Sequence, residues 1–118
     1  MAAKKQIGAY TITSVICTPG PANSLLAQVN YAGSTQGFGT ALGTVTFVIG
    51  KSGTASDYGL CYLDNGEIST YTGQGTYESH GPKWSTHNVG QLSNGLTYES
   101  EGEIDLVART WTTYAVER

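Results

Sequence analysis

Apolar and polar residues alternate along most of this chain, in short segments that are rich in Val, Ile, Thr and Tyr. No segment keeps apolar residues at the i, i+3, i+4, i+7 spacing of an amphipathic helix for more than one turn. The pattern therefore predicts eight β-strands and little helix. The expected strands are residues 7–16, 25–33, 43–49, 57–64, 68–78, 83–91, 96–106 and 108–117.

Clusters of turn residues separate these segments, and loops are expected at residues 18–24, 33–37, 50–56, 64–66, 79–82 and 93–95. The strongest signals are Asn65-Gly66 and Asn94-Gly95. Both central residues of a type I′ hairpin turn need a positive φ, which Asn and Gly adopt readily. Short turns between consecutive strands predict an antiparallel meander, because parallel neighbours need long crossovers.

Eight antiparallel strands in a chain of this length can form a sandwich or a closed barrel. A Gly-x-Gly-Thr pattern occurs twice, at residues 37–40 and 73–76. Glycine inside a strand marks a sharp bend or the close approach of another backbone, and small barrels need such corners to close. We therefore predict an all-β fold, a single eight-stranded antiparallel up-and-down β-barrel over residues 1–118. Residues 1–6 are expected to form a disordered tail.

The charge pattern narrows the function classes. Charged residues make up 13% of the chain and the net charge is −3. The basic residues form no cluster that could neutralise phosphates, which argues against nucleic acid as a partner. No segment approaches the ~20 apolar residues of a membrane helix, and no apolar run follows Lys4 and Lys5 as in a secretory signal. Cys17 and Cys61 are expected to be buried free thiols, and the expected location is the cytoplasm.

Carboxylates fall on every second position of the segment 97–111, where Glu99, Glu101, Glu103 and Asp105 alternate with an apolar set. Burying this row of like charges would cost several kcal/mol per group. We therefore expect Glu99 and Glu103 to face solvent and the opposite set, which begins with Tyr98, to face the lumen. The phase of Glu101 and Asp105 is open, because a bulge at Gly102 would shift the alternation.

Aromatic side chains are the main candidates for a ligand site. They form consistent same-face sets, which suit either a filled core or a pocket with apolar walls and hydroxyl donors. Trp84 is expected to face the lumen together with Tyr98. The predicted substrate-binding residues are Tyr58, Tyr62, Tyr77, Trp84 and Tyr98.

The candidate catalytic residues are Glu78, Glu101 and Arg109. Either carboxylate, or a tyrosine hydroxyl, would move a proton. Arg109 would either form an ion pair with Asp105 or Glu101, or orient a substrate oxygen. His80 is expected in a turn. His87 is expected in a strand, where the alternation does not decide whether it faces inward or outward. We find no ligand spacing of the zinc or calcium type and no phosphate-binding or dinucleotide motif, so no metal or other cofactor is expected.

Several Gly-based motifs resemble a known family. The segments GSTQGFGTALGTVTF, SGTASDYGLCYLDNG, GQGTYES and VGQLSNGLTYESEGEIDL, within residues 33–106, are similar to uncharacterised bacterial proteins of the allene oxide cyclase barrel-like group. The resemblance implies an eight-stranded antiparallel barrel of the allene oxide cyclase or lipocalin type, whose lumen holds a small, largely apolar molecule. It does not extend to residues 107–118, and none of the catalytic residues of the better-known cyclases can be carried over.

Two functions follow as expectations. The first is a cofactor-independent cyclase, isomerase or lyase that acts on a small apolar organic molecule in the lumen. The alternative is a non-catalytic small-molecule-binding or structural barrel. A cavity above roughly 300 Å³ with a polar group at its base favours the enzyme, and a filled lumen favours the alternative. The outer face of residues 43–49 is compatible with a homodimer or homotrimer.

Overall fold

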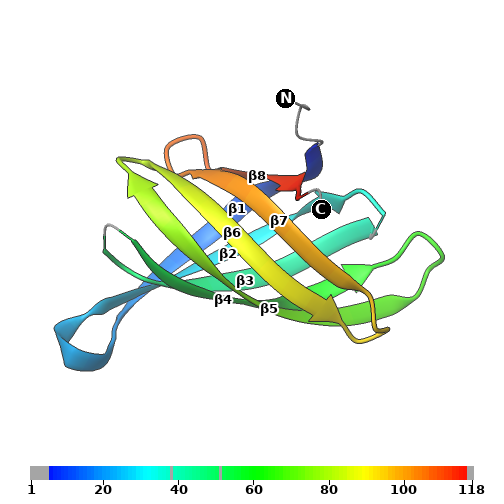
Figure 1. Ribbon diagram of the computed structural model, residues 1–118, viewed down its shortest axis with the longest axis horizontal. Coiled ribbons are helices and arrows are strands. Elements are labelled where there is room, and N and C mark those ends of the chain that lie inside the picture. Colours follow the sequence, from blue (N-terminus) through cyan, green and yellow to red (C-terminus); the bar gives the residue numbers. More distant parts are fainter. Residues whose placement is uncertain (1–5, 38, 51, 117–118) are drawn as a thin grey trace.

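The strands form a closed barrel in the computed structural model, which describes residues 6–37, 39–50 and 52–116 (Figure 1). Each strand pairs with the next along the chain, and β8 closes the barrel against β1. The predicted eight-stranded antiparallel up-and-down barrel is therefore confirmed. The strands are β1 (Gln6–Pro19), β2 (Leu25–Thr35), β3 (Gly39–Val48), β4 (Ser52–Tyr62), β5 (Ile68–His80), β6 (Lys83–Leu92), β7 (Thr97–Asp105) and β8 (Thr110–Ala115).

Several strands are longer than the sequence pattern predicted. β4 begins at Ser52, inside the loop expected at residues 50–56, because Ala55 pairs with Phe47 and Asp57 with Val45 in the β3–β4 ladder. Strand pairing here overrides the turn preference of a Gly- and Ser-rich segment. At the other end of the chain, Gln6 already belongs to β1, which shortens the expected tail; residues 1–5 lie outside the described residues.

The two Asn-Gly hairpins exist, but their turn type differs from the expected one. In these two loops, φ is positive at Gly66 (90°) and Gly95 (95°), but it is not positive at Asn65 or Asn94. Each Asn instead accepts a hydrogen bond through its side-chain Oδ1, from the backbone N–H two residues later. These loops therefore have three residues and end on a left-handed glycine, a common alternative to the two-residue type I′ turn.

One hairpin extends well beyond the barrel wall. β1 pairs with β8 only as far as Thr11, and the rest of β1 continues with β2 as the projecting arm of Figure 1. A short 3₁₀ helix, Pro21–Asn23, forms its tip, where Ala22 and Asn23 have positive φ. Cys17 lies exposed on this arm, so the expectation that both cysteines are buried is wrong for Cys17 and right for Cys61.

An apolar cluster fills the end of the lumen near the β3–β4 and β5–β6 turns. The rings of Phe47, Tyr77 and Trp84 pack with centroid distances of 5.0 to 5.1 Å, beside the fully buried Ile104. The Tyr77 hydroxyl donates to the Val48 carbonyl and accepts from the Gly50 N–H, so it closes the β3–β4 turn. This cluster seals one end of the barrel, and the remaining free space lies towards the other end.

No helix in the described part of the chain has the length and apolar character needed to cross a membrane.

Candidate functional site

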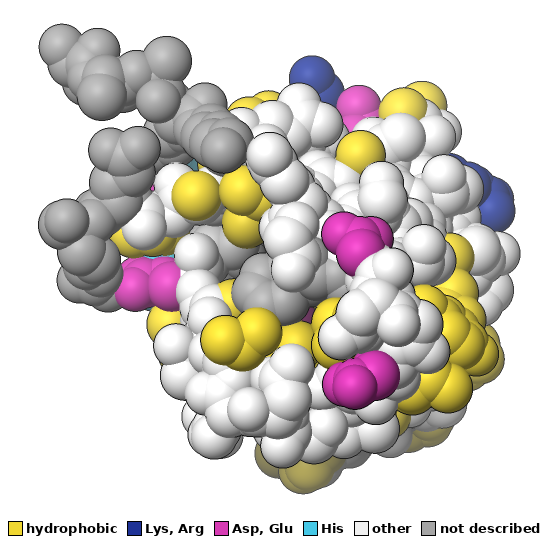
Figure 2. Space-filling view, turned by 90° about the vertical axis from the view of Figure 1, so that its right-hand side faces the viewer, with side chains coloured by type: hydrophobic (Ala, Val, Ile, Leu, Met, Phe, Trp, Pro, Cys, Tyr) yellow, Lys and Arg dark blue, Asp and Glu magenta, His cyan; other side chains and the backbone are white. Residues whose placement is uncertain are grey.

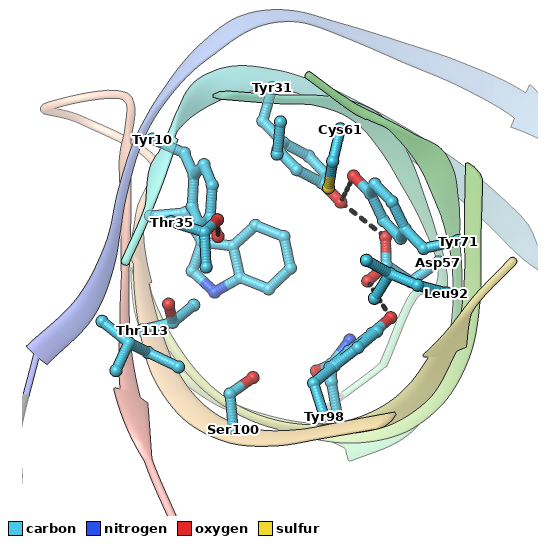
Figure 3. Close-up of a pocket in the computed structure, with 14 residues that line it drawn as sticks. Tyr10, Tyr31, Thr35, Asp57, Cys61, Tyr71, Leu92, Tyr98, Ser100 and Thr113 are labelled. Atoms are coloured by element: carbon cyan, nitrogen blue, oxygen red, sulfur yellow. Dashed lines mark hydrogen bonds between the residues drawn. The ribbon is translucent and has the colours of Figure 1, made fainter. Parts of the chain in front are cut away.

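A cavity of about 60 Å³ occupies the half of the lumen that the apolar cluster leaves open (Figure 3). Its wall comes from all strands of the barrel, and it includes one acidic side chain, Asp57. The described wall residues include no Lys, Arg or His. The cavity is smaller than the roughly 300 Å³ of a typical ligand pocket, so only a small molecule, or a small part of a larger one, fits beside Asp57.

Three tyrosines converge on the Asp57 carboxylate from β2, β5 and β7 (Figure 3). The Tyr31 hydroxyl donates to Asp57 Oδ1 at 2.6 Å, and the Tyr98 hydroxyl donates to Asp57 Oδ2 at 3.2 Å. The Tyr71 hydroxyl lies 2.6 Å from that of Tyr31, which places it one hydrogen bond away from the carboxylate. We call these four residues the Asp57 cluster.

Glycines on the inner wall make room for this cluster. Gly43 on β3 and Gly59 on β4 are register partners, and Gly59 also pairs with Tyr71 on β5. A Cβ atom at Gly43 would clash with the Tyr71 hydroxyl and lie 2.6 Å from that of Tyr31, and one at Gly59 would lie 2.6 Å from the Tyr71 hydroxyl. The missing side chains allow the two hydroxyls to meet in the lumen.

Asp57 is a carboxyl group poised to change its charge near neutral pH. Only 5% of the residue is exposed. Burial raises its pKa from 3.8 to about 6, and the hydrogen bonds from Tyr31 and Tyr98 oppose this rise because they favour the charged form. Burial, together with the negative charge of Asp57, raises the pKa of the Tyr31, Tyr71 and Tyr98 hydroxyls well above the usual range. These hydroxyls therefore remain protonated donors at neutral pH.

The structure divides the predicted substrate-binding residues among three places. Tyr98 lines the cavity, whereas Tyr77 and Trp84 belong to the apolar cluster at the sealed end. Tyr58 and Tyr62 are 49% and 46% exposed on the outer wall, so a lumen role for them is wrong. Alternation explains this correction, because the inward positions of β4 are Ala55, Asp57 and Cys61.

The three predicted catalytic residues lie outside the lumen. Glu78 and Glu101 border the same open hollow on the outer wall, together with His87. Arg109 is exposed in the β7–β8 turn with a φ of 60°. In that turn, Asp105 Oδ1 accepts from the backbone N–H groups of residues 107 and 108. The prediction that Glu78 or Glu101 transfers a proton in the lumen with the support of Arg109 is therefore wrong, because none of the three side chains lies there.

The orientation of the acidic strand β7 is as predicted. Trp84 is buried at 8% exposure and Tyr98 faces the cavity, whereas Glu103 is exposed and Glu99 accepts a hydrogen bond from His87 Nε2 at 2.7 Å on the outer wall. The pairing of β6 with β7 runs without a register shift through Gly102. Alternation therefore continues there, and Glu101 shares the outer face.

Sequence reasoning missed Asp57 and its partner Tyr31. The sequence pattern predicts Asp57 as the first residue of a strand that follows a loop, whereas it lies in the middle of β4. One signal was present: Asp57 shares its phase with Ala55 and Cys61, so a lone acid occupies a small and apolar strand face. The Cys61 thiol also lines the cavity. Its pKa is raised mainly by burial and, to a smaller extent, by the negative charge of Asp57.

The described residues contain no group of three or more His, Cys, Asp or Glu side chains that could hold a metal ion. Comparison of the chain with protein-family models, curated proteins and solved structures finds no match. Membership of the allene oxide cyclase barrel-like group therefore stays a prediction.

Proposed function

We propose that the protein is a cofactor-free proton-transfer enzyme, of the isomerase, cyclase or lyase type, that acts on a small, largely apolar organic molecule in the lumen. One observation carries this proposal. A buried carboxyl group with a pKa of about 6 lies in a mostly apolar cavity, held by two tyrosine hydroxyls and with no basic side chain in the described wall. General bases are most effective when their pKa lies near the working pH.

The Asp57 cluster supports a simple reaction. The ionised carboxylate accepts a proton from a carbon atom of the substrate, and the electron pair of the C–H bond moves into the substrate's π system. The carboxylic acid then returns the proton at another carbon. Tyr31 and Tyr98 fix the direction of the carboxylate, and the apolar walls limit the access of water.

The barrel end nearest the cavity disfavours an anionic substrate. Figure 2 faces this end, which carries the β4–β5 and β6–β7 turns. Asp and Glu side chains lie on the face seen in this view, whereas Lys and Arg side chains show only near its edge, so an anionic substrate would approach like charges. A non-catalytic binding or structural barrel is the second candidate, and the small cavity together with the sealed end favours it.

We also propose a cytoplasmic location and a homodimer or homotrimer. The free thiols of Cys17 and Cys61 support the location, because cytoplasmic proteins keep their thiols reduced. Exposed apolar side chains on the outer faces of β3, β4 and β5 support self-association through the barrel wall. The large exposed apolar side chains in this area are Leu42, Val48, Tyr58, Tyr62 and Ile68.

Proton transfer can be measured as hydrogen–deuterium exchange into small carbon acids, such as cyclopentanone and nitroethane, in heavy water by NMR. The wild-type protein is expected to accelerate exchange, and Asp57→Asn to lose about 100-fold or more of that acceleration, because the base is gone. Asp64→Asn, in the exposed β4–β5 turn, is the matched control and should exchange at the wild-type rate. Equal acceleration by Asp57→Asn would refute the proposed role, and no exchange with any compound would favour the non-catalytic candidate.

A further inference from the structure

Two buried polar atoms of the cavity wall, Asn88 Nδ2 and Thr113 Oγ1, have no hydrogen-bond partner among the described residues. A hydroxyl can donate or accept, so Asn88 restricts a ligand more than Thr113 does. Asn88 on β6 is 2% exposed, and its side chain lines the same cavity as Asp57. The Asn88 Nδ2 atom is buried and has no hydrogen-bond acceptor among the described residues. A buried donor without an acceptor costs folding free energy, so such a group calls for an explanation.

The neighbouring strand leaves space for this carboxamide. Gly75 on β5 is the register partner of Asn88, and a Cβ atom there would lie 2.9 Å from Asn88 Oδ1. The same Cβ would clash with the backbone carbonyl oxygen of His87, so a larger residue at position 75 would displace both β6 and the carboxamide. The glycine therefore accommodates the close approach of β6 together with the inward amide of Asn88.

Asn88 and Asp57 together restrict the chemistry of a ligand. An amide N–H only donates, so its partner must be an acceptor. An anionic ligand is disfavoured, because it would share a low-dielectric cavity with Asp57 and the described wall offers no cation. The remaining apolar wall, with Ala41, Leu92 and Trp111, favours a hydrocarbon body. A neutral molecule with one oxygen acceptor satisfies all three conditions.

We propose that Asn88 Nδ2 binds the oxygen of the substrate, and that the substrate is a small uncharged carbonyl compound such as a ketone or aldehyde. This inference rests on the proposed function of Asp57. When Asp57 removes a proton next to the carbonyl group, the C–H electron pair forms a C=C bond and the C=O π pair moves to the oxygen. The N–H of Asn88 stabilises the negative charge that develops there. A substrate that also carries a β,γ C=C bond gives a dienolate, which takes the proton back from Asp57 at its γ carbon to form the conjugated isomer, so no further reactant is needed. A saturated ketone such as cyclopentanone takes the proton back at the same carbon, and the reaction is then hydrogen exchange.

Equilibrium binding of cyclopentanone tests the role of Asn88 without turnover. The infrared C=O stretch of bound cyclopentanone should shift to lower frequency in the wild-type protein. In Asn88→Leu that shift should disappear and the dissociation constant should rise about tenfold. Gln91→Leu is the matched control, because it removes an amide from the exposed face of the same strand and should leave both readouts unchanged. Absence of cyclopentanone binding to the wild-type protein, or an unchanged shift and affinity in Asn88→Leu, would overturn the inference.

Stability separates a ligand-binding role from a structural one. Asn88→Leu is expected to keep or raise the Tm, because it removes a buried donor that has no acceptor. Asn88→Ala serves as the second variant if the leucine does not fit. A Tm loss in both variants, with no loss of the infrared shift in either, would identify Asn88 as structural and overturn the inference.

Two further compounds define the ligand class. Methylenecyclopentane has the shape of cyclopentanone without the oxygen and should bind about tenfold more weakly. Cyclopentylammonium tests whether the cavity instead binds a cation against Asp57, and tighter binding of this ion than of cyclopentanone would overturn the inference. The two proposals fail separately. If exchange survives in Asp57→Asn while binding still depends on Asn88, the catalytic role of Asp57 is removed and Asn88 is left as a carbonyl-binding group without that reaction. If binding does not depend on Asn88 while exchange depends on Asp57, only the inference is removed.

Discussion

Replacing Asp57 with asparagine is expected to stabilise the barrel at about pH 8 and to flatten the pH dependence of its unfolding free energy. Because the folded-state pKa is raised, the folded protein holds the proton more tightly than the unfolded chain does. The stability from this proton is complete below the unfolded pKa of 3.8 and is lost as the pH rises through about 6. A shift of this size corresponds to about 3 kcal/mol.

Urea unfolding at a series of pH values measures this effect. The wild-type free energy of unfolding should fall between about pH 4 and pH 7, and the Asp57→Asn curve should lack most of that fall. Asp64→Asn, whose side chain is exposed, should follow the wild-type curve. If the curves of wild type and Asp57→Asn run parallel across this range, Asp57 does not bury its charge as the structure indicates.

The second large effect is expected at Gly59, where alanine should destabilise the barrel by about 3 kcal/mol. A Cβ atom there would lie 2.7 Å from Gly43 Cα and would clash with the Leu42 carbonyl oxygen, and both are backbone atoms of the paired strand β3. The strands would have to separate at the place where Tyr71 enters the lumen. Chemical denaturation of Gly59→Ala against the wild-type protein gives the value.

Gly50→Ala is the matched control, because the nearest atom to a Cβ at Gly50 is 3.4 Å away. Its stability should stay within about 0.5 kcal/mol of the wild-type value. A Gly59→Ala variant as stable as Gly50→Ala would show that β3 and β4 are not packed as closely as described.

The fold could be predicted from the sequence because its determinants are local. Alternation identified the strands, and the glycines of the two Asn-Gly loops located hairpins correctly even though the turn type was wrong. The alternation on β7 also gave the right orientation of Glu99, Glu103 and Tyr98, since a row of like charges cannot be buried cheaply.

The candidate site depends on which strands become neighbours, and alternation alone does not show this. Asp57, Tyr31 and Tyr71 are separated by up to 40 positions, and their contact depends on the register of the strands β2 to β5. The phase of β4 was decisive. The same-face aromatic set predicts Tyr58 and Tyr62 at a ligand, whereas the inward phase of β4 belongs to Asp57 and Cys61.

Two of the strand glycines have a role at the site that the alternation of apolar and polar residues does not reveal. The sequence pattern predicts that strand glycines form corners that help the barrel to close. Gly43 and Gly59 also supply the space in which the hydroxyls of Tyr31 and Tyr71 meet. Two paired inward glycines therefore indicate that longer side chains from other strands fill the space beside them. Only the fold shows that these side chains are Tyr31 and Tyr71.

The most direct test of the central claim is the titration of the Asp57 carboxyl carbon by NMR, with its signal assigned from its loss in Asp57→Asn. We expect a midpoint at about pH 6 and a rate constant kcat/KM for cyclopentanone exchange that rises with pH through the same midpoint, because the base must be deprotonated. A midpoint near the ordinary value of 3.8, or an exchange rate that does not follow the titration of Asp57, would contradict it.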